Sequence, residues 1–454
     1  MSVLEQLRKA VGEQNVLVGD LVAGYDRDWT GAWRGDPLAV VRPATTDEVS
    51  AVVTACAQAG VPLVPQGGNT GLVGAASPSD GEVVLSTSRL RAVGVPDPAT
   101  GTVEAEAGAT LEAVQVAARS AGLELGVDLA SRGTATIGGV LATNAGGARV
   151  LRHGTTRAQV LGLEAVLADG SVVTRMNGLP KDNTGYDLVQ LLVGSEGTLG
   201  VLTRAVLRLS PRPAARAAAL LALEDAASAV AVARALRAVP GLDALEFYTA
   251  AGLDLVLAAG RARTPFADAA PVHVLAEAVG PDAEVLAEAL AEALQELPGL
   301  QDAALATSET DRARLWALRE SHTEVLAPLE PVKLDVAVPI VALAPFLEEL
   351  DGVVAGVAPG VVPVPFGHLA EGNVHVNLPG ARPFDADGAV TDAVLGLVAS
   401  YGGSISAEHG IGRAKRRWLH LGRSAADVAA MRAVKQALDP AGLLSPGRVL
   451  PDSA

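Results

Sequence analysis

The chain has 454 residues, a single cysteine and a net charge of −16. This acidic balance argues against nucleic acid as a partner, because the chain offers no broad basic surface to phosphates. The lone cysteine, Cys56, excludes an intramolecular disulfide and a cysteine-based metal site, as is typical of proteins from a reducing compartment. The length exceeds what one hydrophobic core supports, so we expect two or three domains.

The N-terminal segment is a charged, amphipathic stretch. It predicts a helix rather than a signal peptide, because it lacks an apolar central run. Elsewhere, no apolar run approaches the roughly 20 residues that a membrane-spanning helix needs. We therefore expect a cytoplasmic protein without a transmembrane segment.

The first 210 residues alternate short strands with helices. A strand at 39–43 precedes a helix at 46–59, for which Thr46 is the expected N-cap. This mixture predicts an α+β region. The later elements of the region are strands at 82–86 and 102–106, a helix at 110–121, a hairpin of strands 160–168 and 171–175 turning at Asp169-Gly170, a helix after 181 and a strand at 205–209.

Three glycine-rich stretches interrupt these elements, at 61–74, 126–147 and 194–200. Such stretches expose consecutive backbone N–H groups and let a pyrophosphate approach the chain closely. None of them is a Walker A loop or a nicotinamide-type G-x-G-x-x-G loop that opens a helix. One such stretch alone would equally be a surface loop, whereas three together predict a backbone-lined site for an extended ligand.

The order and residue types of these stretches resemble the three flavin loops of the vanillyl-alcohol-oxidase type of FAD-binding fold. The resemblance rests on P-Q-G-G-N-T-G at 65–71, the paired glycines at 138–139 and 146–147, and G-S-E-G-T-L-G at 194–200. Relatives that tether the flavin covalently carry His at the position of Asn69, so the resemblance implies noncovalent FAD. The FAD contacts that it implies are Pro65, Gln66, Gly67, Gly68, Asn69, Thr70, Gly71, Gly74, Asp128, Ser131, Thr134, Thr136, Gly138, Gly139, Thr143, Asn144, Gly146, Glu196, Gly197, Gly200 and Val201.

A second region begins after 210–213, where two prolines end a strand. Its pattern predicts an α+β cap domain with an antiparallel sheet. By the resemblance, the chain then returns to the flavin domain, which gives a two-lobed FAD-binding domain at 1–210, a substrate and metal cap at 211–420 and a C-terminal segment at 421–454. The elements expected in this region are helices at 223–239, 282–297, 315–326 and 425–438 and strands at 272–276 and 332–339.

Three of the seven histidines lie in two short pieces, P-F-G-H-L-A-E-G-N-V-H-V-N-L at 365–378 and S-A-E-H-G-I-G at 406–412. His375 and Asn377 are two apart on an expected strand and therefore point to the same side, while a turn at Glu371-Gly372 brings His368 back. Two imidazoles and a later carboxylate suit a divalent metal. By spacing alone, such histidines are more often half-buried structural residues.

Together with R-E-S-H-T at 319–323 and Lys333, these pieces resemble the D-2-hydroxyacid dehydrogenases, whose members oxidise D-2-hydroxyglutarate, D-lactate or glycolate. With the flavin loops, the resemblance covers nearly the whole chain. It implies a divalent metal, Zn²⁺ or Mn²⁺, on His368, His375 and Glu408, and it implies His409 as the catalytic base. The substrate-binding residues that it implies are Arg319, Thr323, Lys333 and Asn377.

Oxidising an α-hydroxyacid removes the hydroxyl proton while the C2 hydride leaves for flavin N5, and a histidine supplies a base with a pKa near neutrality. Arg319 and Lys333 are two cations beyond the metal, which favours the dicarboxylate D-2-hydroxyglutarate over D-lactate. Glycolate and D-malate stay open, since Arg319 alone would serve a monocarboxylate. The expected electron acceptor is an electron-transfer flavoprotein or a quinone, and a homodimer is compatible with the sequence.

Rival interpretations remain. They are an oxidase of the same fold that uses oxygen, a metal-dependent hydrolase whose glycine-rich loops hold a nucleotide, and a noncatalytic flavin-binding module. The basic run Arg413, Lys415, Arg416 and Arg417 is either a solvated helix start or a docking site for an acidic electron carrier. Structural roles are expected for His153, His273, His322 and His420, and core positions for Tyr186 and Trp316.

Overall fold

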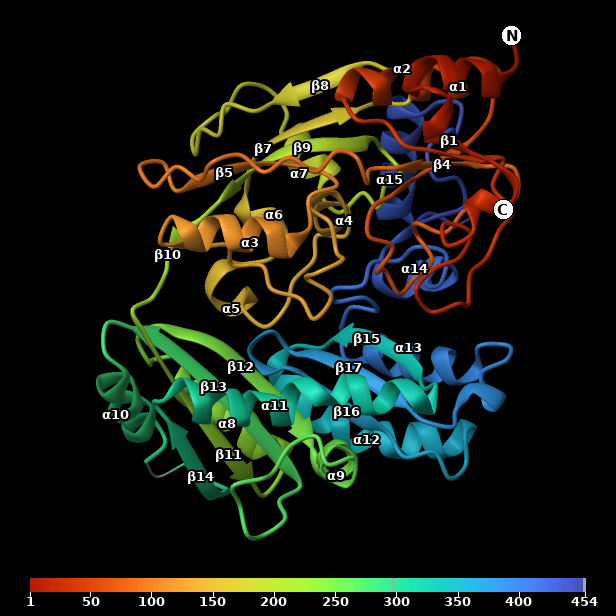
Figure 1. The fold of residues 1–454 in the computed structure, drawn as a ribbon. Coiled ribbons are helices and arrows are strands. Elements are labelled where there is room, and N and C mark those ends of the chain that lie inside the picture. Colours follow the sequence, from red (N-terminus) through yellow and green to blue (C-terminus); the bar gives the residue numbers. More distant parts are fainter. Residues whose placement is uncertain (296, 452–454) are drawn as a thin grey trace. The chain divides into compact units, whose positions relative to one another are not determined.

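The computed structural model describes residues 1–295 and 297–451. The chain forms two compact units (Figure 1). The first unit comprises residues 1–147, 153–212 and 408–454, and the second comprises 148–152 and 213–407. The predicted boundary at 210–213 therefore meets the start of the second unit, whereas the return to the first unit comes at Glu408 rather than at 421. Residue 296 of the predicted helix 282–297 and residues 452–454 of the predicted C-terminal segment lie outside the described residues.

A four-stranded sheet in the order β1-β2-β4-β3 forms one lobe of the first unit. Strands β2, β4 and β3 run parallel and are almost wholly buried, as strands covered on both faces are. The expected N-cap Thr46 is wrong by one residue: Thr45 caps the helix, and the Thr46 hydroxyl donates to Glu164 over 2.5 Å. The elements are α1 (Val3–Val11), β1 (Val16–Leu17), β2 (Ala39–Val41), α2 (Thr46–Ala59), β3 (Leu63–Gln66) and β4 (Val83–Ser86).

A second four-stranded sheet, β5-β9-β7-β8, is antiparallel throughout and forms the other lobe. The predicted turn at Asp169-Gly170 joins β7 to β8, and Gly170 has the positive φ of 86° that such a turn favours. Each sheet contributes to its own hydrophobic core, in agreement with a two-lobed domain. The elements are β5 (Thr102–Glu106), α3 (Leu111–Ser120), β6 (Leu123–Glu124), α4 (Ile137–Ala142), α5 (Val150–His153), α6 (Thr156–Gln159), β7 (Val160–Val166), β8 (Val172–Arg175), α7 (Leu188–Leu192), β9 (Val201–Arg208) and β10 (Ser210–Pro211).

The segment before α7 differs from the expectation. The helix begins only at Leu188, where Asp187 is the N-cap and accepts the Gln190 N–H. Residues 181–187 instead form turns, and the Arg175 guanidinium anchors them to Asp182 at 3.1 Å. Tyr186 lies in these turns and is 97% exposed, so the prediction that it belongs to the core is wrong.

The last part of the chain completes the first unit. After α14 (Leu419–Gly422), helix α15 (Ala425–Leu438) lies in blue among elements from the red and yellow parts of the chain (Figure 1). Leu444 forms a bridge with Leu63 at the start of β3. In addition, Lys435 Nζ donates to the Thr198 carbonyl over 2.8 Å. The C-terminal segment is therefore an integral part of the N-terminal lobes rather than an appended tail.

The second unit is built on a seven-stranded sheet in the order β14-β11-β13-β12-β16-β17-β15, whose neighbours are all antiparallel. The predicted antiparallel sheet of the cap is therefore confirmed. The helix expected at 223–239 is shorter because Leu223 ends β11 and Asp225 caps α8. The elements are β11 (Ala215–Leu223), α8 (Ala226–Leu236), β12 (Leu242–Thr249), α9 (Ala250–Ala258), β13 (Val272–Gly280), α10 (Ala283–Ala293), β14 (Leu300–Ala306), α11 (Glu309–Leu326), β15 (Val332–Ala337), α12 (Leu343–Val357), β16 (Val364–His368), β17 (Asn373–Leu378) and α13 (Ala389–Ser400).

The two faces of this sheet are covered by different helices. Helices α9 and α11 pack on the face that carries Leu220, Tyr248 and Phe366, where they form one hydrophobic cluster. Helices α8, α10 and α13 also contact the sheet, and α12 packs on α8 and α13. Successive side chains of a strand point to opposite faces of the sheet. The pairing register between strands therefore tells which residues lie on the face that contacts α11. This side carries the polar residues of the candidate site.

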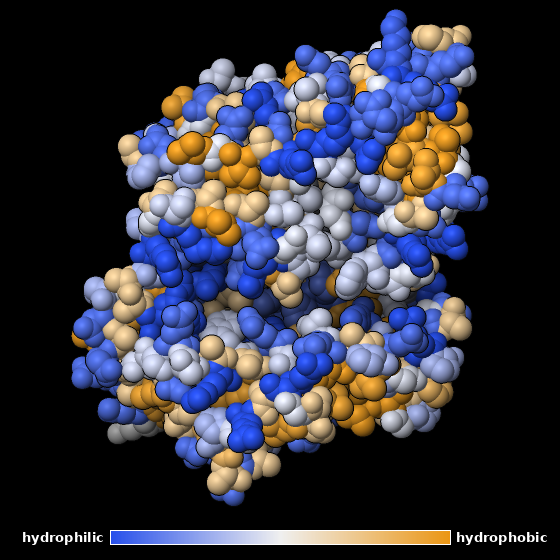
Figure 2. Space-filling view, in the orientation of Figure 1, coloured by the Kyte–Doolittle hydropathy of each residue, from blue (hydrophilic) through white to orange (hydrophobic). Residues whose placement is uncertain are grey.

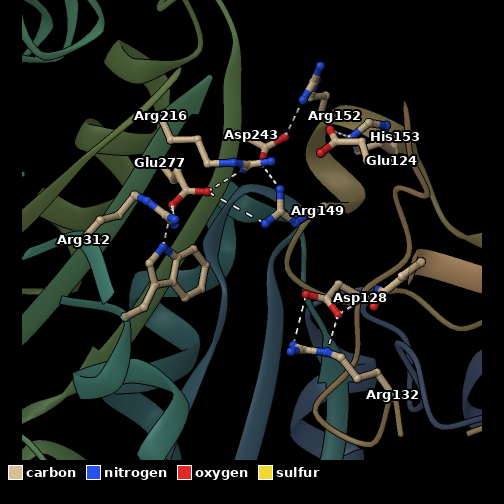
Figure 3. Close-up of polar contacts among 12 residues, drawn as sticks. Glu124, Asp128, Arg132, Arg149, Arg152, His153, Arg216, Asp243, Glu277 and Arg312 are labelled. Carbon is tan, nitrogen blue, oxygen red and sulfur yellow. Dashed lines mark hydrogen bonds and ion pairs between the residues drawn. The ribbon is translucent and has the colours of Figure 1, made fainter. Parts of the chain in front are cut away.

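A buried ion cluster joins the two segments of the second unit, 148–152 and 213–407 (Figure 3). Its centre is Asp243, which a β-bulge between Leu242 and Ala244 inserts into β12. Arg149 and Arg152 lie 2.6 Å and 3.1 Å from the two Asp243 oxygens. Burial raises the pKa of the Asp243 carboxyl, but the charges of the surrounding arginines outweigh burial and hold that pKa below its usual value. The other members are Arg216, which bridges Asp243 and Glu277, and Arg312 and Trp316, which both donate to Glu277.

Hydrophobic residues on the face shown in Figure 2 form separate groups among hydrophilic ones. Exposed examples in the whole chain include Trp29 and Val95. Among the described residues, none of the helices combines the length and the apolar character that crossing a bilayer demands.

Candidate active site

The first two glycine-rich stretches pack directly against each other in the first unit. A Cβ atom on Gly68 would lie 1.9 Å from the Thr134 carbonyl oxygen, and one on Gly67 would lie 2.2 Å from the Thr136 hydroxyl. Side chains are therefore excluded at both glycines by backbone and buried neighbours. Glycine allows the two loops to meet with their backbones exposed along one edge, which is the cradle that a dinucleotide pyrophosphate requires.

Each of the three stretches also contains one non-glycine residue in the left-handed conformation. These are Asn69, Asn144 and Glu196, with φ values of 52°, 50° and 51°. Asn tolerates this region better than most residues, whereas Glu does so rarely. Strained backbone of this kind is concentrated at binding sites, and here it occurs once in each predicted flavin loop.

Several predicted flavin residues use their side chains to hold the loops. Gln66 is buried on β3, and its amide donates to the carbonyls of Tyr25 and Ala76. Asn69 donates to the Arg27 carbonyl over 2.7 Å. Thr136 caps α4, and Asn144 accepts the Arg157 N–H. Their direct contribution to a flavin would therefore come from the backbone, in keeping with a glycine-lined site.

The remaining predicted flavin residues lie in the same three stretches, except Val201, which opens β9 directly after the third. Asp128 pairs with Arg132 at 2.7 Å and accepts from Gln115 (Figure 3). Gly138 is tight against Ala107, where a Cβ would lie at 2.8 Å. Thr143 donates to the Gly139 carbonyl. The others are Pro65, Thr70, Gly71, Gly74, Ser131, Gly146, Gly197, Gly200 and Val201.

The segment that carries Glu408 and His409 is fixed to the second and third stretches. Glu196 accepts the Ile411 N–H over 2.8 Å with one carboxylate oxygen and the Gly412 N–H over 2.7 Å with the other. Burial raises the pKa of Glu196 to about 7, against the opposing effect of these N–H groups and of Lys415. Glu408 accepts the Gly147 N–H over 2.5 Å. These bonds explain why the chain rejoins the first unit at Glu408 rather than at 421.

In the second unit, the pairing of β15, β16 and β17 places four predicted site residues on the side of the sheet that faces α11. These residues are Lys333, His368, His375 and Asn377. Across β15 and β17, Lys333 pairs with Asn377 and Asp335 pairs with His375. The turn predicted at Glu371-Gly372 is confirmed, since Gly372 has a φ of 67° between β16 and β17. As a result, the His368 and His375 rings meet edge to face with their centroids 5.3 Å apart.

His368 and Arg319 share one partner, Glu246, which lies opposite His368 on β12. His368 Nδ1 is 2.6 Å from Glu246 Oε1, and Arg319 Nη2 is 2.8 Å from Glu246 Oε2. Burial alone would raise the pKa of this carboxyl, but the charges of His368 and Arg319 hold it below its usual value. Glu246 is therefore ionised and links two predicted site residues.

His375 has a similar neighbour. Its Nδ1 lies 3.3 Å from Asp335 Oδ1, and Asn373 donates to the same oxygen over 2.9 Å. Asp335 is 1% exposed. A carboxylate at Nδ1 makes Nε2 the ring nitrogen through which each imidazole would bind a cation, the arrangement seen around histidine ligands of Zn²⁺. The donor set of His368, His375 and a carboxylate such as Glu408 therefore fits a divalent metal that accepts nitrogen and oxygen ligands.

The predicted substrate residues differ in burial. Arg319 is 7% exposed and lies over the Phe366 ring at 4.6 Å. Thr323, one turn later on α11, is exposed, and so is Lys333. Partial burial of the Lys333 ammonium and the charge of Arg382 lower the pKa of Lys333. Asn377 is buried and donates to the His375 carbonyl.

Two residues of this site, Glu246 and Asp335, were missed in the sequence. Asp335 could have been found, because it follows Lys333 by two positions on an expected strand and therefore faces the same side. Glu246 gave no such signal, since β12 was not predicted as a strand. Its role follows from strand pairing between residues 122 positions apart.

Of the four histidines expected to have structural roles, His273 and His322 are buried, His153 is half-buried and His420 is exposed. His273 stacks on Tyr248, and His322 is tilted against Tyr248 and Phe366. Burial lowers the pKa of His273 to about 4 and that of His322 to about 3, so both are neutral. Trp316 packs at the edge of the hydrophobic cluster. The basic run is not uniformly solvated, because Lys415 is buried and Arg413 lies over Trp33.

Two family models match the chain, and the boundary between them agrees with the start of the second unit. Residues 37–175 match the family described as FAD binding domain, and residues 212–449 match the one described as FAD linked oxidases, C-terminal domain. Among solved structures, p-cresol methylhydroxylase has a TM-score of 0.79 at 18% identity, covering 99% of this chain and 96% of that one. The 4-ethylphenol oxidase of Gulosibacter chungangensis has a TM-score of 0.78 at 18% identity, with coverages of 99% and 97%. These likenesses confirm the predicted fold.

Curated relatives are similar over nearly the whole chain. The protein named D-2-hydroxyglutarate dehydrogenase in Xanthomonas citri pv. viticola is 43% identical over 94% of this chain and 92% of that one. The protein of the same name in Stutzerimonas stutzeri is 35% identical, with coverages of 99% and 98%. The mitochondrial one of Bos taurus is 38% identical, with coverages of 94% and 79%. The chain therefore belongs to the FAD-linked oxidases, in the family of the D-2-hydroxyglutarate dehydrogenases.

Proposed function

We propose that this protein oxidises D-2-hydroxyglutarate to 2-oxoglutarate with noncovalent FAD and a divalent metal. The observation that carries the proposal is the pair of imidazoles, His368 and His375, beside the buried Arg319 on one side of a sheet. Histidines of this kind would hold a divalent cation that acts as a Lewis acid, and an arginine suits a carboxylate. The names of the relatives agree with this substrate.

The chain's residues would act as follows. His368, His375 and Glu408 would hold the metal, and Arg319 would bind a substrate carboxylate with its remaining N–H groups. Lys333 and Thr323 would reach a second carboxylate from exposed positions, while Asn377 would orient the substrate. His409 would take the hydroxyl proton, and the C2 hydride would leave in the same step, so that the carbonyl forms.

Two bound groups would supply chemistry that side chains lack. FAD accepts the hydride at N5, and Zn²⁺ or Mn²⁺ lowers the pKa of the substrate hydroxyl. The protein contributes the loops, the ligands and the base.

An electron-transfer flavoprotein or a quinone would reoxidise the flavin, in keeping with the dehydrogenase names of the relatives. A cytoplasmic location and a homodimeric state belong to the same proposal. The oxidase alternative has a direct test. Stopped-flow mixing of reduced enzyme with air should give reoxidation much slower than turnover, and reoxidation as fast as turnover would establish an oxidase.

The experiment that tests the proposal is anaerobic bleaching of the flavin absorbance. A panel of D- and L-2-hydroxyacids, including D-2-hydroxyglutarate, D-lactate, glycolate and D-malate, is mixed with the purified protein before and after treatment with a chelator. We expect fastest bleaching by D-2-hydroxyglutarate, loss of bleaching after chelation, and recovery on adding Zn²⁺ or Mn²⁺. Preference for an L-acid, or full bleaching without metal, would contradict the proposal.

A further inference from the structure

Both carboxylate oxygens of Glu246 are engaged by residues that serve different ligands in the proposed function. Oε1 lies 2.6 Å from His368 Nδ1, and Oε2 lies 2.8 Å from Arg319 Nη2. The Glu246 side chain is 1% exposed, so water does not compete for either oxygen. One buried carboxylate thus contacts both a proposed metal ligand, His368 on β16, and a proposed substrate-binding residue, Arg319 on α11.

The contact with His368 selects a tautomer. A carboxylate accepts only, so the ring proton at this contact is on Nδ1, and a cation that binds His368 would bind it through Nε2. Glu246 and His368 face each other in the register of β12 and β16, which fixes the ring as well as the proton. A histidine held in this way is oriented toward a cation before the cation arrives.

The contact with Arg319 selects an orientation. The planar guanidinium is held from two sides, by Glu246 at one edge and by the Phe366 ring 4.6 Å from its central carbon. A guanidinium with a fixed plane presents its remaining N–H groups in one direction, which suits bidentate binding of a carboxylate. Without Glu246, the guanidinium would keep its contact with the Phe366 ring and lose the ion pair that fixes its direction within the plane.

We propose that Glu246 is a positioning residue with two separate effects: it prepares His368 for the metal, and it aims Arg319 at a substrate carboxylate. The assignment rests on the proposed function. It means that loss of Glu246 weakens metal binding and substrate binding independently. Saturating the protein with metal would therefore not restore substrate binding.

Asp335 provides a matched control. It lies beside His375 Nδ1, as Glu246 lies beside His368 Nδ1, and it is equally buried. It stands on β15, however, which β16 and β17 separate from β12 in the sheet. Asp335→Asn should therefore disturb one histidine and leave the Arg319 guanidinium in place.

The test compares Glu246→Gln with Asp335→Asn in the FAD-loaded protein. Equilibrium dialysis against Zn²⁺ and Mn²⁺ measures the metal Kd, and we expect both variants to raise it about 10- to 100-fold. The KM and kcat for D-2-hydroxyglutarate are then measured with a dye acceptor at saturating metal. We expect Asp335→Asn to regain the wild-type KM and Glu246→Gln to keep a KM raised about tenfold, the loss of one oriented charge-assisted contact.

Each other outcome overturns the assignment. An unchanged metal Kd in Glu246→Gln removes the effect on His368, and a wild-type KM at saturating metal removes the effect on Arg319. A KM of Glu246→Gln below that of the wild type would mean that Glu246 weakens the attraction of Arg319 for the substrate carboxylate instead of orienting the guanidinium. Where Glu246→Gln does not fold, Glu246→Asp keeps the charge but is too short for both partners, and it carries the same two measurements. If no hydroxyacid bleaches the wild type, the proposed function fails, while dialysis still decides the histidine effect.

Discussion

Arg149 Nη1 lies 2.6 Å from Asp243 Oδ2, which is fully buried on β12. We expect Asp243→Asn to destabilise the protein by about 3–5 kcal/mol, because three arginines would lose their shared buried counter-charge. Differential scanning calorimetry should show this as a lower Tm of the transition that includes the second unit.

The exposed pair Arg314–Asp311 provides the control for Asp243→Asn. Exposed ion pairs contribute at most about 1 kcal/mol, so Asp311→Asn should leave the Tm almost unchanged. Equal shifts in the two variants would show that the ion cluster contributes no more than a surface pair.

The buried carboxyl of Glu196 predicts a pH dependence. Burial raises its pKa to about 7 from an ordinary value of 4.5, so the folded protein binds this proton more tightly than the unfolded chain does. The stability that it contributes is fully present below the ordinary value and is lost as the pH rises through about 7. The Tm of the wild type should therefore fall relative to that of Glu196→Gln between about pH 5 and 8. Parallel Tm curves for the two proteins would rule out a raised pKa.

Asn69 predicts the mode of flavin attachment. Its side chain is an amide that donates to the Arg27 carbonyl, and it offers no nucleophile to the isoalloxazine ring. Acid precipitation of the purified protein should release all the flavin into the supernatant, measured by its absorbance. Flavin that stays with the precipitate would indicate a covalent bond to some other side chain.

Lys333 predicts substrate selectivity. Lys333 lies opposite Asn377 in the register of β15 and β17, and a second cation matters only for a substrate with a second carboxylate. Lys333→Ala should raise the KM for D-2-hydroxyglutarate about tenfold and leave the KM for D-lactate nearly unchanged. Equal increases for both substrates would instead place Lys333 at the carboxylate that they share.

His409 is expected to move the substrate proton. His409→Ala should retain FAD, because the predicted flavin cradle is built from the backbone of the glycine-rich stretches, and should lose reduction of the flavin by hydroxyacid by at least about 100-fold. Flavin content is measured by absorbance, and reduction by anaerobic stopped-flow. A variant that reduces its flavin at the wild-type rate would exclude His409 as the base.

The sequence predicted those features that depend on local patterns. Alternation placed Asn377 beside His375, and the glycine pattern marked all three stretches that carry a left-handed residue. Features that depend on distant pairing were missed. Glu246 reaches His368 across 122 positions, and Arg149 reaches Asp243 across 94. Tyr186 was misplaced because an aromatic side chain was expected in the core, although its neighbours in 181–187 are polar and Asp187 starts the helix only after it.

The path of the chain restricts how this protein can be recombined with its relatives. The chain passes from one unit to the other after residues 147, 152, 212 and 407. A chimera that exchanges only residues 213–407 would take Asp243 from one parent and Arg149 and Arg152 from the other. Exchange of the cap between relatives therefore requires that the short segment 148–152 travels with it, or that both parents keep the same charges at these three positions.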